Sequence, residues 1–113
     1  MEKKISYDPE EDILYFNEGK SVQDSLDIGN MFIEFSGDGE IVGMEVLNAS
    51  ETISELTGRD FSSVELADIF DAEIKIFFKG DFAFITLFFV TEKEGEEIKE
   101  SVGVNVPTNA VSA

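Results

Sequence analysis

The sequence predicts an α+β domain of about seven mostly antiparallel strands and two short helices, in the order ββββ-αα-βββ. Two runs of strand-like alternation flank a central segment that carries two helix-capping signals. Eleven of the 113 residues are phenylalanine, and aromatic and branched side chains favour the half-buried surface of a sheet. Helices grouped between two antiparallel runs indicate an α+β arrangement instead of a βαβ repeat.

The first run of strands contains two hairpin signals. Residues 5–7 and 13–16 are expected to be short strands joined by an acidic turn, which Asp8-Pro9 opens. Residues 22–28 alternate loosely and are expected at the edge of the sheet. Residues 31–36 and 41–47 surround Gly37-Asp38-Gly39, the strongest hairpin signal in this half.

The central segment predicts the two helices. Asn48 with Glu51 three positions later, and Ser62 with Glu65, each match a capping box. The first helix is expected to end at Gly58, which follows Thr57.

The second run of strands is expected over residues 72–78, 82–90 and 98–106. Residues 82–90 are apolar on both faces, which is typical of a central strand that is covered on both sides. The cover is either the helices and the rest of the sheet or a second copy of the chain, and the sequence favours the first. We therefore expect a monomer in preference to a homodimer, with one domain over residues 1–106 and a disordered tail over residues 107–113.

Negative charge dominates the composition. Eight basic residues against 25 acidic ones give a formal net charge of −17, and residues 8–60 contain two basic against fourteen acidic side chains. Such a surface repels phosphate backbones and anionic headgroups over about a Debye length, so we expect no nucleic-acid and no membrane partner. Basic proteins and divalent cations are the expected partners, although the excess charge alone also serves solubility.

The chain contains neither cysteine nor histidine. Disulfides, thiolate nucleophiles, an imidazole base and the usual zinc ligands are therefore excluded, and we do not expect an enzyme. The longest apolar stretch, residues 82–90, is far shorter than the roughly twenty residues of a membrane-spanning helix, and no targeting signal is evident. A cytoplasmic location is expected.

About residues 4–56 resemble a family of short prokaryotic domains of unknown function. The residues that carry the resemblance are Tyr7-Asp8-Pro9, Asp12, Leu14-Tyr15, Asp38-Gly39, Ile41-Val42-Gly43, Glu45, Leu47 and Ala49-Ser50. The resemblance implies a β-meander followed by a helix. It supplies no catalytic residue to carry over, and the C-terminal strands lie outside it.

Oxygen ligands alone can hold hard cations, and calcium in particular takes six to eight oxygen atoms in flexible geometry. The first hairpin turn is expected to bring Asp8 and Asp12 together, and a strand over residues 22–28 would bring Asp27 to the same end of the sheet. The predicted metal ligands are Asp8, Glu10, Glu11, Asp12, Asp24 and Asp27.

This spacing matches only the start of an EF-hand loop. The sixth position is Ile13 where glycine is needed, and the twelfth is Gly19 where glutamate is needed. The alternative is that Asp8-Pro9 simply opens a turn and the other acids are solvated. The acidic loop of residues 92–97 is a weaker candidate, since Lys93 partly neutralises it.

Two functions remain. The first is weak binding of a divalent cation such as calcium through these loop carboxylates. The second is an acidic interaction module, antitoxin-like or inhibitor-like, that binds a basic protein through charge complementarity.

Overall fold

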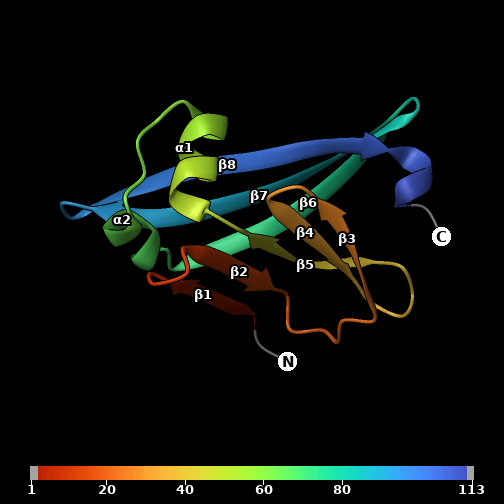
Figure 1. Cartoon of the computed structure of the whole chain (residues 1–113), viewed down its shortest axis with the longest axis horizontal. Coiled ribbons are helices and arrows are strands. Elements are labelled where there is room, and N and C mark those ends of the chain that lie inside the picture. The colour runs from red at the N-terminus through yellow and green to blue at the C-terminus, as the bar shows by residue number, and fades with distance from the viewer. Residues whose placement is uncertain (1–2, 112–113) are drawn as a thin grey trace.

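Two antiparallel sheets and two helices make up the computed structural model, which describes residues 3–111 (Figure 1). The elements are β1 (Lys4–Asp8), β2 (Ile13–Asn17), β3 (Asp24–Ile28), β4 (Met31–Phe35), β5 (Ile41–Val46), α1 (Ala49–Thr57), α2 (Ser63–Ala67), β6 (Asp71–Lys79), β7 (Phe82–Lys93), β8 (Glu96–Pro107) and a short 3-10 turn (Thr108–Ala110). The α+β class is confirmed. Five strands precede the helices where the expected order has four, because residues 24–28 of the loosely alternating segment pair with β4.

The first five strands form one sheet in the order β1-β2-β5-β4-β3. The edge position of β3 agrees with its loose alternation. The predicted β-meander is wrong in one respect, because β5 lies between β2 and β4 in the sheet. Phe16, Met44 and Ile33 lie side by side across these three strands, and all three side chains are buried. A continuous apolar row across the middle of the sheet explains why β2 pairs with β5 and not with β3.

The last three strands form a second sheet in the order β6-β7-β8, with β7 in the centre. One face of β7 presents Ala83, Ile85, Leu87 and Phe89 to the core, and each is at most 2% exposed. These residues join the buried side chains of the first sheet in one cluster, to which the helices add Ile53 and Leu66. The two sheets and the helices therefore share a single core.

The two helices begin in different ways. Ser62 accepts a hydrogen bond from the backbone N–H of Glu65, so the second capping box is confirmed. Asn48 occupies the N-cap position of α1, but its φ of 49° is left-handed and its side chain makes no capping hydrogen bond. The first capping box is therefore wrong. As expected, α1 ends at Gly58, whose φ is 74°.

Two further expectations need correction. Pro107 ends β8, residues 108–110 form the 3-10 turn and Val111 is buried, so the disordered tail is wrong for residues 107–111. Residues 112 and 113 lie outside the described residues. Cover on both faces of β7 is also wrong for a single copy of the chain, since Phe82 and Phe88 are exposed. Within residues 3–111, neither helix has the length and apolar character to cross a membrane.

Candidate functional site

The β1–β2 turn holds the first group of predicted ligands. The Oδ1 atom of Asp8 accepts hydrogen bonds from the backbone N–H groups of Glu10 at 2.9 Å and Glu11 at 3.2 Å. This is the side-chain-to-backbone pattern by which aspartate opens a turn. Pro9, Glu10 and Glu11 are exposed at the tip. The structure therefore bears out the turn-opening role of Asp8.

Asp12 closes the same turn and contacts α1. Its carboxylate accepts hydrogen bonds from the Tyr7 hydroxyl at 2.6 Å, the Ser50 hydroxyl at 2.6 Å and the Ser50 backbone N–H at 3.0 Å. Its backbone carbonyl accepts the N–H of Ala49 at 2.8 Å. Two of the N–H groups that every helix start leaves without an intrahelical partner are thereby satisfied. Asp12 therefore caps the N-terminus of α1, the role that the sequence predicted for Asn48.

Burial and hydrogen bonding act in opposite directions on Asp12. Burial alone would raise the pKa of its carboxyl, but the hydrogen bonds from Ser50 and Tyr7 outweigh burial and hold that pKa below its ordinary value. For Tyr7, burial, the hydrogen bond to Asp12 and the charge of Asp12 together raise the pKa to about 12.

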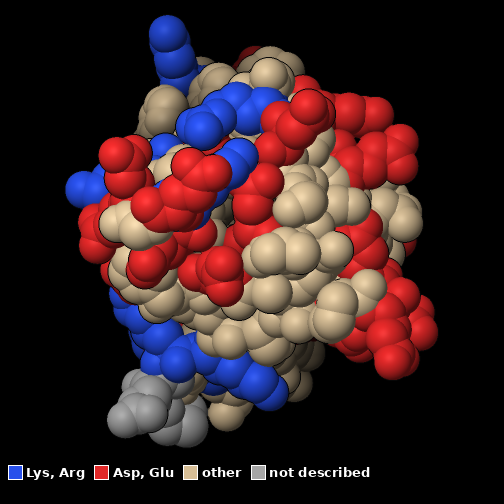
Figure 2. Space-filling view, turned by 90° about the vertical axis from the view of Figure 1, so that its left-hand side faces the viewer, with Lys and Arg blue, Asp and Glu red and all other residues tan. Residues whose placement is uncertain are grey.

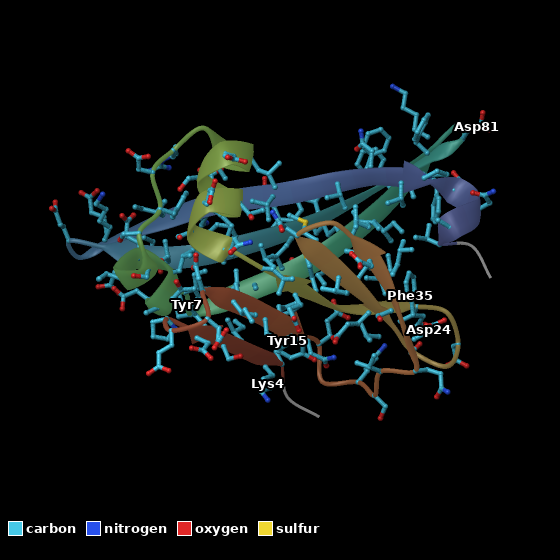
Figure 3. The ribbon with its side chains drawn as sticks, in the orientation of Figure 1. Lys4, Tyr7, Tyr15, Asp24, Phe35 and Asp81 are labelled. Atoms are coloured by element: carbon cyan, nitrogen blue, oxygen red, sulfur yellow. The ribbon has the colours of Figure 1, made fainter. Side chains whose placement is uncertain are left out.

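The remaining predicted ligands do not join this turn. Asp27 lies near the same end of the sheet as Asp8, as expected, but β3 and β1 are opposite edges, four strand spacings or about 19 Å apart. Asp24 lies further along β3, and Figure 3 shows it well away from Tyr7. Among residues 3–111, no group of three or more acidic side chains is placed to hold a metal ion. The convergence of the six residues is therefore wrong, and calcium binding stays a prediction.

A second polar cluster lies on the outer face of the first sheet. The Tyr15 hydroxyl donates to Oε1 of Glu34 at 2.9 Å, and the buried Asn17 side chain approaches the same oxygen at 3.5 Å. Burial, followed by the hydrogen bond to Glu34 and the charge of Glu34, raises the pKa of Tyr15. Gly43 lies beneath this cluster, where a Cβ atom would collide with Glu34 and come within 2.8 Å of the Phe16 carbonyl oxygen.

A third feature is a hollow of about 370 Å³ that is lined by Asp68, Phe70, Glu92 and Glu94. We call it the acidic hollow. Asp68 caps the C-terminus of α2, Glu92 lies in β7, and Glu94 lies in the β7–β8 turn. Phe70 is 52% exposed, so part of its ring surface is accessible.

The walls of the acidic hollow are held together by contacts between α2 and β7. The Thr91 hydroxyl donates to the backbone carbonyl of Glu65 at 2.7 Å, and Lys93 Nζ lies 3.7 Å from Oε1 of Glu65. The backbone N–H of Phe70 donates to the carbonyl of Val90 at 3.0 Å. Figure 2 views this end of the molecule and shows more acidic than basic side chains, with uncharged residues between them.

The lining of the acidic hollow suits an organic cation. Three carboxylates supply negative charge, and a phenyl ring attracts a cation that is placed over its face. A lysine ammonium or an arginine guanidinium from another protein combines that charge with an apolar stem. The sequence singled out the acidic loop of residues 92–97 but missed Asp68 and Phe70, because only the tertiary contact of α2 with β7 brings them beside it.

The family comparison covers the first sheet and the start of α1. The model of a family described as a protein of unknown function, DUF2283, matches residues 4–50. The uncharacterized protein MJ0789 of Methanocaldococcus jannaschii is 42% identical over 52 residues, which make up 45% of each of the two chains. The chain thus spans about half the length of this relative. No solved structure matches. The first sheet, with Asp12 and Gly43, is therefore similar to a family of unknown function, and the acidic hollow lies outside the matched segment.

Proposed function

We propose that this protein is a non-catalytic acidic interaction module that binds a basic protein partner, with a lysine or arginine side chain of the partner seated in the acidic hollow. The observation that carries the proposal is the lining of that hollow, which consists of three carboxylates and one exposed phenyl ring. A formal charge of −17 attracts such a partner over distance and speeds association.

The charge pattern around the hollow supports this assignment. Lys93 is the basic residue at the end of β7, beside the hollow, and its ammonium forms an ion pair with the Glu65 carboxylate on α2. Glu92 and Glu94 are exposed, so an incoming cation reaches them without displacing buried groups. The hydroxyl of Thr91 and the ion pair of Lys93 hold α2 against β7, which keeps Asp68 close to the two glutamates before any partner arrives. Such preorganisation reduces the entropy lost on binding.

Fluorescence anisotropy tests the proposal with a labelled Gly/Ser peptide that contains a central Arg-Lys-Arg segment. The wild type is expected to bind with saturation, more tightly at low than at high salt. The double variant Glu92→Gln/Glu94→Gln should weaken binding about tenfold, and Phe70→Ala about threefold, as a lost cation–π contact at an exposed site predicts.

The matched control is Asp24→Asn/Asp27→Asn, which removes the same charge from β3 at the far edge of the first sheet. This control should change the affinity less than about twofold, since only diffuse attraction is reduced. Equal losses in the two double variants would show a response to net charge alone and would contradict the proposal, as would an absence of saturable binding by the wild type.

A further inference from the structure

The outer face of β6-β7-β8, which points away from the core, exposes aromatic side chains. Phe77 is 59% exposed, Phe82 51% and Phe88 43%. Strand alternation places these residues and Phe84 on the face opposite the buried side of β7, and the rings of Phe77 and Phe84 stack with centroids 5.0 Å apart. An exposed aromatic patch of this kind marks an interaction surface.

We propose that a second copy of the chain covers this face, in a two-fold symmetric dimer that stacks the two three-stranded sheets face to face. The sequence pattern is the first support. A strand with one solvent-exposed face alternates apolar and polar residues, whereas residues 82–90 are apolar on both faces. A single copy of the chain covers one of these faces, and the dimer covers the other.

The shape of the face is complementary to itself. A shallow hollow of about 340 Å³ lies at one end, with Phe88, Val90 and Ser101 in its lining, and the exposed Phe82 lies at the other end of β7. A two-fold axis that crosses the strands at Thr86 sets Phe82 of one copy over Val90 of the other, because each is four residues from Thr86. The ring of each copy then enters the hollow of the other, as an isologous interface requires.

The same axis brings opposite charges together. Lys79 pairs with Phe82 and Asp71 pairs with Val90 in the strand register, so Lys79 of one copy lies opposite Asp71 of the other. The part of the face that β6 spans carries three lysines against two carboxylates, whereas the whole chain has a net charge of −17. The basic residues are Lys75, Lys79 and Lys99, and the acidic ones are Asp71 and Glu73. Glu92 and Glu97 lie on the same face beyond the end of β6. Two acidic copies can therefore meet on this face without strong repulsion.

The centre and the size of the face also suit a dimer. Lys75, Thr86 and Gly103 lie side by side across the three strands, so the axis sets each of them opposite its own counterpart in the other copy. The small Thr86 and Gly103 permit close approach there, and the two Lys75 side chains face each other at the edge of the interface, where solvent and salt screen their charges. Lys75 lies at the edge, with Nζ 5.6 Å from the centre of the Phe88 ring.

Strands of nine to twelve residues in a three-stranded sheet give a planar area of roughly 500 Å². A standard interface buries about 800 Å² per partner, so this face corresponds to a dimer interface at the small end of the range.

Light scattering coupled to size-exclusion chromatography provides the first test. The wild type is expected at twice the 12.5 kDa mass of one chain, with a monomer fraction that grows on dilution. Phe82→Ser should shift the protein to the monomer while circular dichroism stays unchanged, because the side chain is half exposed and outside the core. A monomeric wild type at all concentrations would overturn the proposal and leave the face to a different partner.

A charge swap tests the two-fold geometry. Its result does not depend on whether the fold tolerates any single substitution. Lys79→Glu should weaken the dimer at least about tenfold, since it sets a glutamate opposite Asp71. Adding Asp71→Lys should restore the dimer. A dimer that resists both Phe82→Ser and Lys79→Glu, or a double variant that stays as weak as Lys79→Glu alone, would place the interface elsewhere and overturn the proposal.

Cross-linking provides a direct reading of proximity because the chain has no cysteine of its own. Thr86→Cys, treated with a short bis-maleimide, should form a covalent dimer, since the axis sets this position opposite itself. The control Glu51→Cys places the thiol at an exposed position of α1, and this variant should not be cross-linked at the same concentration. Equal cross-linking at both positions would show random collision and contradict the assigned face.

Discussion

Asp12 in the β1–β2 turn and Ser50 in α1, 38 positions apart in the chain, are joined by three hydrogen-bond contacts. The carboxylate of Asp12 accepts both the N–H and the hydroxyl of Ser50, with the hydroxyl at 2.6 Å. Both residues lie in the segment that matches the family model. This pair fixes the start of the helix against the first hairpin and thereby sets one end of the shared core.

Removal of this carboxylate should destabilise the whole fold. Asp12→Ala is expected to lower the free energy of unfolding by about 2–3 kcal/mol, because a charged acceptor is lost and alanine must adopt the left-handed φ of 57°. Urea denaturation measures the change. Asp27→Ala, which removes an exposed carboxylate from β3, should stay within about 0.5 kcal/mol of the wild type. Equal losses in the two variants would contradict the role of Asp12.

The same carboxylate should contribute to acid sensitivity. Because its folded pKa lies below the ordinary value of 3.8, Asp12 stabilises the fold at pH values above about 4 and loses that contribution as the pH falls through the folded pKa. Asp12→Asn should therefore show a shallower loss of unfolding free energy below pH about 4 than the wild type. Denaturation curves across this range supply the comparison, and parallel acid limbs would be the contrary result.

Tyr7 should titrate at unusually high pH. Burial, the hydrogen bond to Asp12 and the charge of Asp12 raise its pKa from 10.0 to about 12. Since the raised pKa favours the neutral phenol in the fold, its contribution to stability is complete below pH 10 and is lost between pH 10 and about 12.

Tyrosinate absorbance measures this titration cleanly, because the chain has no tryptophan and only two tyrosines. In Tyr15→Phe, the remaining tyrosine should ionise near pH 12, and Asp12→Asn in the same background should lower its pKa. A midpoint near 10 while the protein remains folded would show that Asp12 does not act on Tyr7.

A methyl group at Gly43 should be costly. The Cβ of Gly43→Ala would lie 2.8 Å from the Phe16 carbonyl oxygen and 3.2 Å from Nδ2 of Asn17, and it would also collide with Glu34. The expected loss is about 1–3 kcal/mol of unfolding free energy. Gly37→Ala is the matched control, since no atom lies within 4 Å of its added Cβ, and it should change stability by less than about 0.5 kcal/mol. Similar melting shifts in both variants would contradict the crowding at Gly43.

Local patterns were sufficient for most of the elements. The Gly37-Asp38-Gly39 hairpin, the helix start at Ser62 and the helix end at Gly58 depend on short-range chemistry, and the structure confirms them. The insertion of β5 beside β2 and the cap that Asp12 supplies to α1 depend on contacts between distant segments. Alternation and capping rules do not contain that information, because they consider only neighbouring residues.

The candidate site shows the same division. The sequence identified excess carboxylate correctly, but it grouped Asp8 with Asp27 because both were expected at one end of the sheet. Strand order separates them, since β1 and β3 are opposite edges. The residues that do come together, Asp68 and Phe70 with Glu92 and Glu94, depend on how α2 packs against β7.

Amide chemical-shift mapping with the Arg-Lys-Arg peptide shows whether a basic side chain occupies the acidic hollow. Saturable shifts are expected at residues 68–70 and 92–94, together with movement of the Phe70 ring resonances. Small linear drifts spread over all acidic residues, with Asp24 and Asp27 moving as far as Glu92, would contradict that occupancy.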